Sequence, residues 1–300
     1  MSTTVAAAPR KLTRKEQREV DSKTRLSSPA ASVIAIVIAI AWTLPTAGLL
    51  ITSLRPSSDS KKTGWWNIFV NPSFTLENYQ TVLGQKSLGM NLINSFVITI
   101  PGVIIPIILA LLAAYAFAWI EFKGRDILFA GVFALQVVPI QVTLIPLLTT
   151  YVKMGISGTF WTVWLSHAIF GLPLAIFLLH NFMKEIPPSL IEAARIDGAG
   201  HVRVFFQVLM PLLTPAVASF GIFQFLWVWN DLLVAMTFAG PDAQPITATI
   251  AQMMTNLSSN ADLLAPAAFI AMFVPVVVFL SLQRFFVRGM LAGGAAQVGE

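Results

Sequence analysis

The chain contains six apolar stretches that are each long enough to cross a lipid bilayer as an α-helix. They cover residues 32–53 and roughly 212–239 and 263–283, and they lie within residues 90–120, 127–152 and 160–183. A helix needs about 20 residues to cross the roughly 30 Å of hydrocarbon in a bilayer. Apolar and polar residues do not alternate along these stretches, so a transmembrane β-barrel is not expected. The sequence therefore predicts an all-α, polytopic membrane protein with six transmembrane helices.

The charge content supports this class and excludes several kinds of site. Charged residues make up 11% of the chain and hydrophobic residues 56%, whereas soluble domains carry about 25% charged residues. The chain has no cysteine, which excludes disulfides, thiol catalysis and cysteine-based metal sites. Three histidines, His167, His180 and His201, are too scattered in the sequence to predict a metal cluster.

Basic residues indicate how the chain is oriented in the membrane. Seven of the 19 lysines and arginines lie in the first 25 residues, a position that suits anionic lipid headgroups rather than nucleic acid. With the N-terminus inside, the inner segments hold 14 basic residues and the outer segments 5. This asymmetry predicts cytosolic termini, with a basic tail at residues 1–31 and a transmembrane domain at 32–300. The first apolar stretch is too long for a cleavable signal peptide and is expected to remain as a helix.

Two longer outer loops are expected, at residues 55–89 and 240–262. The first contains Trp65 and Trp66. Paired tryptophans suit the interface between membrane and water, and packing of the pair against the helical bundle is an equal alternative.

The most informative cytosolic segment covers residues 184–211, between the fourth and fifth spans. Ser189 and Glu192 have the spacing of a capping box, and either Gly198 or Gly200 can adopt the left-handed conformation that ends a helix. A second helix is expected at residues 201–210, ended by Pro211. Its apolar flank would hold Val202, Phe205, Phe206 and Leu209. The alternative is an ordinary loop that packs on its own bundle.

The residues of this segment match those of a known family. The spacing of Glu192-Ala193-Ala194, Gly198, Val208 and Pro211 is that of the EAA loop, with Met210 in place of the usual leucine. This loop occurs in permease subunits of bacterial ATP-binding-cassette (ABC) importers. Further matches lie at residues 94–95, 113–118, 122–125, 225–231 and 283–289. Over roughly residues 71–294 the chain resembles permeases of carbohydrate importers, in particular the smaller permease of maltose-type importers.

The resemblance implies a function and a set of partners. The chain would be the transmembrane permease subunit of an ATP-driven importer in the bacterial inner membrane, moving a sugar or oligosaccharide into the cell by alternating access. Its implied partners are a second homologous permease, a dimer of nucleotide-binding ATPase subunits and an extracellular sugar-binding protein.

The resemblance also implies roles for residues of the cytosolic segment. This segment would act as a coupling loop that docks into a cleft of the ATPase. Glu192 would anchor it by charge, and Ala193, Ala194 and Gly198 would allow a close fit. Phe205 and Phe206 would fill the cleft. Asp197 and Pro211 complete the coupling set.

The chain itself is not expected to be an enzyme. It lacks the sequence Gly-x-x-x-x-Gly-Lys-Ser/Thr, whose backbone amides bind nucleotide phosphates. No catalytic residue, metal or cofactor is predicted on this chain, so ATP and magnesium are assigned to the partner ATPase.

Asp231 is the most unusual residue in the predicted spans. A carboxylate inside a bilayer costs about 2.5 kcal/mol or more and is retained where it has a partner or faces water. One interpretation places Asp231 and Asn230 in the translocation path, with Trp227 and Trp229 as stacking surfaces for sugar rings. The other, slightly favoured, places Asp231 near the outer end of the helix in a structural role. Five further polar residues in apolar stretches are expected to form interhelical hydrogen bonds, namely Gln136, Gln141, His167, Asn181 and Gln224.

Two other function classes are alternatives to the importer subunit. A self-sufficient, ion-coupled secondary transporter would need charged relays inside its spans, and only Asp231 qualifies. An intramembrane serine hydrolase would need a nucleophile beside a base. Ser166 and His167 are adjacent and diverge by about 100° on a helix, so they do not form such a pair.

Overall fold

The computed structural model describes residues 29–84, 86–255 and 257–295. Most of the predicted cytosolic tail at residues 1–31 lies outside these described residues, as does the end of the chain after residue 295. The chain divides into two compact units, residues 1–75 and residues 76–300.

The first unit contains one candidate span, α2 (Pro29–Ser53), which begins three residues before the predicted stretch. It is followed by α3 (Ser57–Ser60) and the short helix η1 (Trp65–Phe69). Trp65 packs on α2 so closely that a Cβ at Gly48 would lie 2.7 Å from its ring nitrogen. Trp66 is exposed. The two neighbouring tryptophans therefore have different environments.

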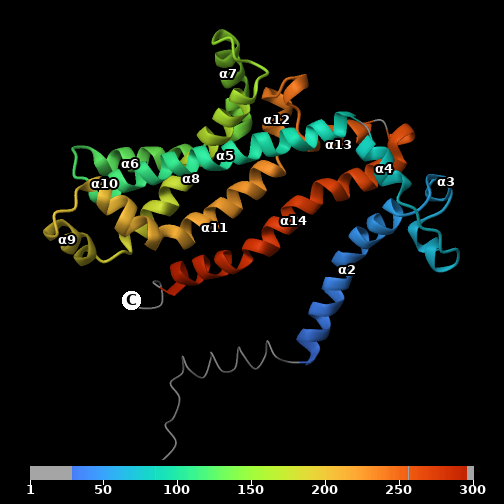
Figure 1. Ribbon diagram of the computed structural model, residues 1–300, viewed down its shortest axis with the longest axis horizontal. Coiled ribbons are helices and arrows are strands. Elements are labelled where there is room, and N and C mark those ends of the chain that lie inside the picture. Colours follow the sequence, from blue (N-terminus) through green and yellow to red (C-terminus); the bar gives the residue numbers. More distant parts are fainter. Residues whose placement is uncertain (1–28, 85, 256, 296–300) are drawn as a thin grey trace, which may run out of the picture. The chain divides into compact units, whose positions relative to one another are not determined.

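The second unit contains four continuous candidate spans (Figure 1). The apolar parts of these helices are Leu88–Trp119, Phe160–Lys184, His201–Trp229 and Leu263–Gln283. They belong to α5 (Lys86–Trp119), α8 (Phe160–Lys184), α11 (Met210–Trp229) with the turns before it, and α14 (Leu257–Ala295). Helix α2 is a fifth candidate span, and a bent helix pair is a sixth if its two helices are counted together. The described residues therefore confirm the all-helical polytopic class.

The predicted third span is not a straight helix. It consists of α6 (Arg125–Ala134) continued by η2 (Leu135–Val137), and then α7 (Ile140–Lys153), with a bend of 101° between the two parts. The residue before a proline is disfavoured in the helical conformation, and Val138, which precedes Pro139, has an extended backbone with ψ of 119°. The proline thus explains the break.

The predicted fifth span ends earlier than expected. Its helix ends at Trp229 rather than near residue 239, and a separate short helix follows, α12 (Leu233–Phe238). The predicted outer loop at residues 240–262 also contains regular structure, namely η4 (Pro241–Ala243), α13 (Ile246–Thr255) and the beginning of α14. Helix α4 (Glu77–Gly84) likewise occupies part of the loop predicted at residues 55–89.

Apolar side chains form two clusters that position the functional segments. In Figure 1, α5 runs alongside α8 and α11, in agreement with the contacts between them. One cluster gathers Leu179 of α8, Leu213 of α11 and Tyr115 near the end of α5. The other joins α7 and α8 to α12 through Tyr151, Val163 and Phe238.

Candidate functional site

The coupling segment, residues 184–211, contains the short helix α9 (Pro188–Ile196). Proline suits the first turn of a helix because the backbone N–H it lacks has no partner there. Pro187 is the N-cap, and no side-chain capping bond forms there, so the capping box predicted from Ser189 and Glu192 is wrong. The helix begins at Pro188, two residues too early for Ser189 to be its N-cap.

Gly198 ends α9 as the sequence predicts. Its φ is +78°, in the left-handed region that glycine adopts without strain. Ala199 N–H bonds to Ala194 O at 2.9 Å, and Gly198 N–H bonds to Arg195 O at 3.0 Å. These two bonds are the Schellman motif. These backbone hydrogen bonds therefore fix the direction in which the chain leaves α9.

The second helix of the coupling segment does not end at Pro211, contrary to the prediction. The chain passes from α10 (His201–Arg203) through the π-helix η3 (Val204–Leu209) into α11, so Pro211 lies in its first turn. Met210 N–H bonds to Phe205 O, five residues earlier. A proline has no N–H and its ring crowds the preceding turn, and the wider π-turn accommodates it.

The two adjacent phenylalanines point to different surroundings. Phe205 is 7% exposed and lies in the bundle core, with its ring edge-on to Tyr115 at 5.5 Å. The Tyr115 hydroxyl is hydrogen-bonded to His201 Nδ1 at 2.7 Å. Phe206 is exposed. The expectation that both rings are offered to a partner is therefore wrong for Phe205, which fixes the segment to α5.

Exposed apolar side chains gather along the coupling segment. We call four of them the apolar patch: Leu190, Ile196, Val202 and Phe206. Ile196 has the largest exposed fraction, 87%. Glu192, Ala193 and Asp197 are exposed beside them, whereas Ala194 is half-buried against the core. The sequence did not identify Ile196 as an exposed contact residue, because its orientation depends on where α9 begins.

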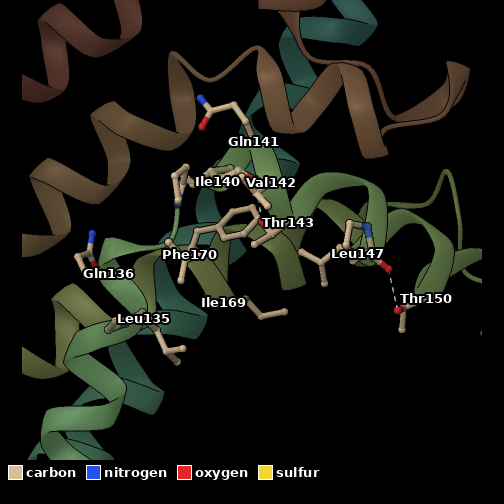
Figure 2. A pocket seen from close by; sticks show the side chains of 14 residues that line it. Leu135, Gln136, Ile140, Gln141, Val142, Thr143, Leu147, Thr150, Ile169 and Phe170 are labelled. Carbon is tan, nitrogen blue, oxygen red and sulfur yellow. Dashed lines mark hydrogen bonds between the residues drawn. The ribbon is translucent and has the colours of Figure 1, made fainter.

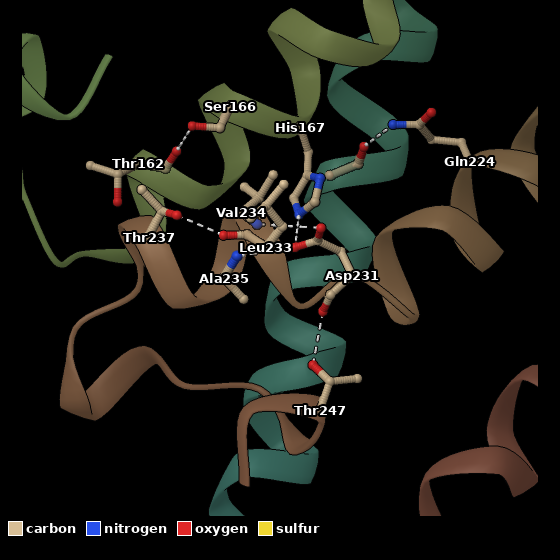
Figure 3. Close-up of polar contacts among 11 residues, drawn as sticks. Thr162, Ser166, His167, Gln224, Asp231, Leu233, Val234, Ala235, Thr237 and Thr247 are labelled. Carbon is tan, nitrogen blue, oxygen red and sulfur yellow. Dashed lines mark hydrogen bonds and ion pairs between the residues drawn. The ribbon is translucent and has the colours of Figure 1, made fainter. Parts of the chain in front are cut away.

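Asp231 lies in the short break between α11 and α12 rather than inside a span (Figure 3). Its carboxylate accepts hydrogen bonds from the backbone N–H groups of Val234, at 3.3 Å, and Ala235, at 3.0 Å. Its Oδ2 is 3.8 Å from Nε2 of the buried His167 on α8. These contacts fix the first turn of α12 and support the structural interpretation of Asp231.

Of the tryptophans beside Asp231, Trp229 is buried and Trp227 is half-buried. Trp229 is 2% exposed, and its indole N–H donates to Ala271 O at 3.0 Å. Trp227 packs edge-on against His167 with ring centroids 5.2 Å apart. Asn230 is exposed, and its amide donates to Leu226 O. Of the four residues predicted for the path, only Asn230 is exposed.

Of the five polar residues predicted to form interhelical hydrogen bonds, Gln224 does so. Gln224 donates to Gly102 O at 3.2 Å and so links α11 to α5. Asn181 contacts its neighbour His180, and His167 forms no hydrogen bond with its ring nitrogens among the described residues. Gln136 and Gln141 are exposed and form no hydrogen bond within the described chain.

These two glutamines line a cavity of about 720 Å³ at the break in the third span (Figure 2). The cavity lies between η2, α7 and α8 and includes Thr143 and Phe170. The sequence contained one signal for it, Pro139 in an apolar stretch, but other prolines in spans gave the same signal without a break.

Most of the chain matches a known family. Residues 102–292 match the binding-protein-dependent transport system inner membrane component. The chain belongs to this family. The permease is 49% identical over 264 residues to the osmoprotective compounds uptake permease protein GgtD of Synechocystis sp., covering 86% of this chain and 89% of the relative.

Two further similarities extend this assignment. The permease is 46% identical over 229 residues to the alpha-glucoside transport system permease protein AglG of Rhizobium meliloti, covering 74% of this chain and 60% of the relative. Its structure matches a bacterial ABC transporter involved in the import of the acidic polysaccharide alginate, with a TM-score of 0.70 and 19% identity. That match covers 93% of this chain and 100% of the other, and it shows the fold.

The permease is thus a multi-pass inner-membrane subunit of an ABC importer and not the catalytic subunit. Transport in this family depends on a binding protein. That dependence decides against the alternative of a self-sufficient, ion-coupled secondary transporter.

Proposed function

We propose that the permease imports a sugar or oligosaccharide by alternating access, driven by ATP hydrolysis on a separate subunit. Its similarity to permeases named for osmoprotective compounds and for α-glucosides supports a small, sugar-like substrate. The complex would contain a second homologous permease, a pair of ATPase subunits that hold ATP and magnesium, and an extracellular sugar-binding protein. Both termini of the permease would be cytosolic.

The observation that carries this proposal is the apolar patch on the coupling segment. Ile196 and Phe206 are exposed on a segment that joins two spans but is itself too polar to lie in lipid. Large exposed apolar side chains rimmed by charge mark protein interfaces. Arg195, Glu192 and Asp197 provide such a rim. A soluble ATPase with an apolar cleft is the partner that this surface fits.

The roles of the coupling residues follow from their exposure. Glu192 would form a charged contact at the rim, and Ala193 would allow the ATPase surface to approach α9 closely. Gly198 would fix the angle between α9 and the following helix. Phe206, rather than Phe205, would enter the cleft. Pro211 would act indirectly, by maintaining the π-turn that presents Phe206.

Replacement of patch residues by a charge tests the proposal. Burial of one large apolar side chain contributes about 1.5–3 kcal/mol, so we expect Ile196→Asp or Phe206→Asp to weaken ATPase binding about 10- to 100-fold. Phe206→Leu, which keeps an apolar side chain, should retain most binding. The measurement is the affinity of the purified permease pair for the ATPase.

Met254→Asp is the matched control, because Met254 is an exposed apolar residue on α13, away from the coupling segment. It should leave ATPase affinity unchanged. Full affinity in both patch variants, or an equal loss in Met254→Asp, would contradict the assignment of the patch to the ATPase.

A further inference from the structure

The break in the third span exposes irregular backbone within an apolar segment. Val138 and Pro139 separate η2 from α7, and the neighbouring Val137 is 81% exposed. In membrane proteins, backbone without helical hydrogen bonds is tolerated where it lines a water-filled cavity or is covered by protein, but not where it faces lipid. The cavity at this break is therefore not a lipid-facing groove.

A second interrupted span lies beside the first. Helix α12 follows the break at Asn230 and Asp231, and it packs against α7 (Figure 1). Tyr151 of α7 meets Phe238 of α12 edge-on, with ring centroids 5.4 Å apart. Interrupted helices in transporters gather around the solute, since their breaks expose backbone and polar groups to it. Two such breaks on neighbouring elements favour a path for solute at this place.

The chemistry of the cavity specifies the class of solute. Its volume of about 720 Å³ falls within the range of about 300–1,000 Å³ that is typical of sites for small molecules. No aspartate, glutamate, lysine or arginine is among its lining residues. The lining therefore offers a charged ligand no charge-assisted hydrogen bond from a side chain, which favours a neutral one.

The polar groups of the lining suit hydroxyl groups. Figure 2 shows Gln136 on η2 and Gln141 on α7 at the edges of the cavity, with their amides pointing away from the ring of Phe170, which lies beside Thr143. Each glutamine amide both donates and accepts hydrogen bonds, and neither is bonded within the described chain. When these two flexible side chains turn toward the cavity, a ring with hydroxyl groups at its edge and C–H groups on its faces would satisfy the amides and the apolar wall together.

The geometry points to a substrate subsite on this permease at the break in its third span, where Gln136, Gln141 and Phe170 contact a neutral glycoside. This inference rests on the proposed function, which supplies the sugar-like substrate. It moves the contact away from Trp227 and Trp229, whose rings are occupied by packing within the permease.

The absence of cysteine from the chain makes the subsite directly testable. Gln141→Cys or Gln136→Cys would carry the permease's single thiol, which a charged, water-soluble methanethiosulfonate can label in the assembled importer. We expect labelling on this chain, slowed at least threefold during turnover with its binding protein and the best transported sugar among trehalose, maltose and raffinose. Gln80→Cys, on the exposed face of α4, should label without protection.

Each other outcome of the labelling would overturn the subsite. No reaction at either position would mean that the second permease covers the cavity. Reaction without protection would mean that the cavity holds water but not the sugar.

Transport measurements separate the subsite from the general function. Gln141→Leu and Gln136→Leu should raise the KM for uptake at least fivefold while ATPase affinity stays at the wild-type value, and Gln80→Leu should change neither. Wild-type KM in both cavity variants would overturn the subsite alone. Failure of the unmodified importer to couple ATP hydrolysis to uptake of any of the three sugars would instead overturn the proposed function.

Discussion

Gly198 and Gly200 have different conformations although both were candidates to end α9. Gly198 has a φ of +78°, whereas Gly200 has a φ of −73°. A Cβ at either position would meet no atom within 4 Å. The two residues therefore differ chiefly in backbone conformation, which makes them a useful pair for substitution.

Gly198→Ala should destabilise the turn between α9 and α10. A left-handed conformation costs a residue with a Cβ about 1–2 kcal/mol. Local opening of the coupling segment should become easier by this amount, so its amides should exchange with solvent about 5- to 30-fold faster. Hydrogen–deuterium exchange of residues 188–203 measures this change.

Gly200→Ala is the control for that measurement. Its backbone is in a region open to any residue, so its exchange should match the wild type. Equal acceleration in the two variants would show that the left-handed turn is not what holds the segment.

At the scale of elements, spans were predictable from the sequence and breaks were not. Hydropathy is a local property, so the six apolar stretches correspond to helices. Proline is ambiguous, because neighbouring helices can satisfy the carbonyl that it leaves free. Pro101 and Pro106 lie inside the continuous α5, whereas Pro139 marks a bend of 101°. That difference depends on packing partners distant in the sequence.

In the candidate site, too, local features were predictable from the sequence and those that depend on distant contacts were not. A glycine turn at Gly198 or Gly200 was predictable, because the Schellman turn needs only its own residues. The burial of Phe205 depends on Tyr115, 90 residues earlier in the chain. The loss of Trp229 from the predicted path likewise depends on Ala271. Sequence patterns identified the segments, while contacts between helices decided which side chains remain available.

The loop after α12 is held by a close backbone contact. Gly240 N–H donates to Gly158 O at 3.0 Å, and a Cβ at Gly240 would lie 2.5 Å from that oxygen. Gly240→Ala must separate the two backbones and should destabilise the permease by about 1–3 kcal/mol. The thermal unfolding midpoint of the purified permease in detergent should fall.

Gly131→Ala provides the comparison, since a Cβ at this position of α6 would meet nothing within 4 Å. Removal of a glycine from a helix interior is favourable by about 0.5–1 kcal/mol. Its midpoint should therefore be unchanged or higher. A Gly240→Ala permease as stable as the wild type would refute the role of this contact in holding α12.

At the scale of the whole molecule, the coupling segment is linked to the bundle on both sides of its turn. Residue Ile191 of α9 is buried in the same cluster as Leu179 of α8. After the turn, His201 and Phe205 contact Tyr115 near the end of α5. Because α5 packs along α8 and α11, we expect a displacement of the coupling segment to reach three spans at once.

Loss of the Tyr115 hydroxyl should weaken this transmission while the apolar patch remains intact. Tyr115→Phe removes the hydrogen bond to His201 Nδ1 but keeps the ring against Phe205. One such bond contributes about 0.5–1.5 kcal/mol, so the number of ATP molecules hydrolysed per sugar imported should rise about two- to tenfold at unchanged ATPase affinity. Tyr151→Phe removes a similar bond, to Ser166 in the other cluster, and should leave that ratio unaltered.

If both variants raise the ratio equally, or neither does, movement of the ATPase reaches the spans by a route other than Tyr115. Parallel assays of uptake and phosphate release in proteoliposomes distinguish these cases, because a simple loss of folded protein lowers both rates and leaves their ratio constant.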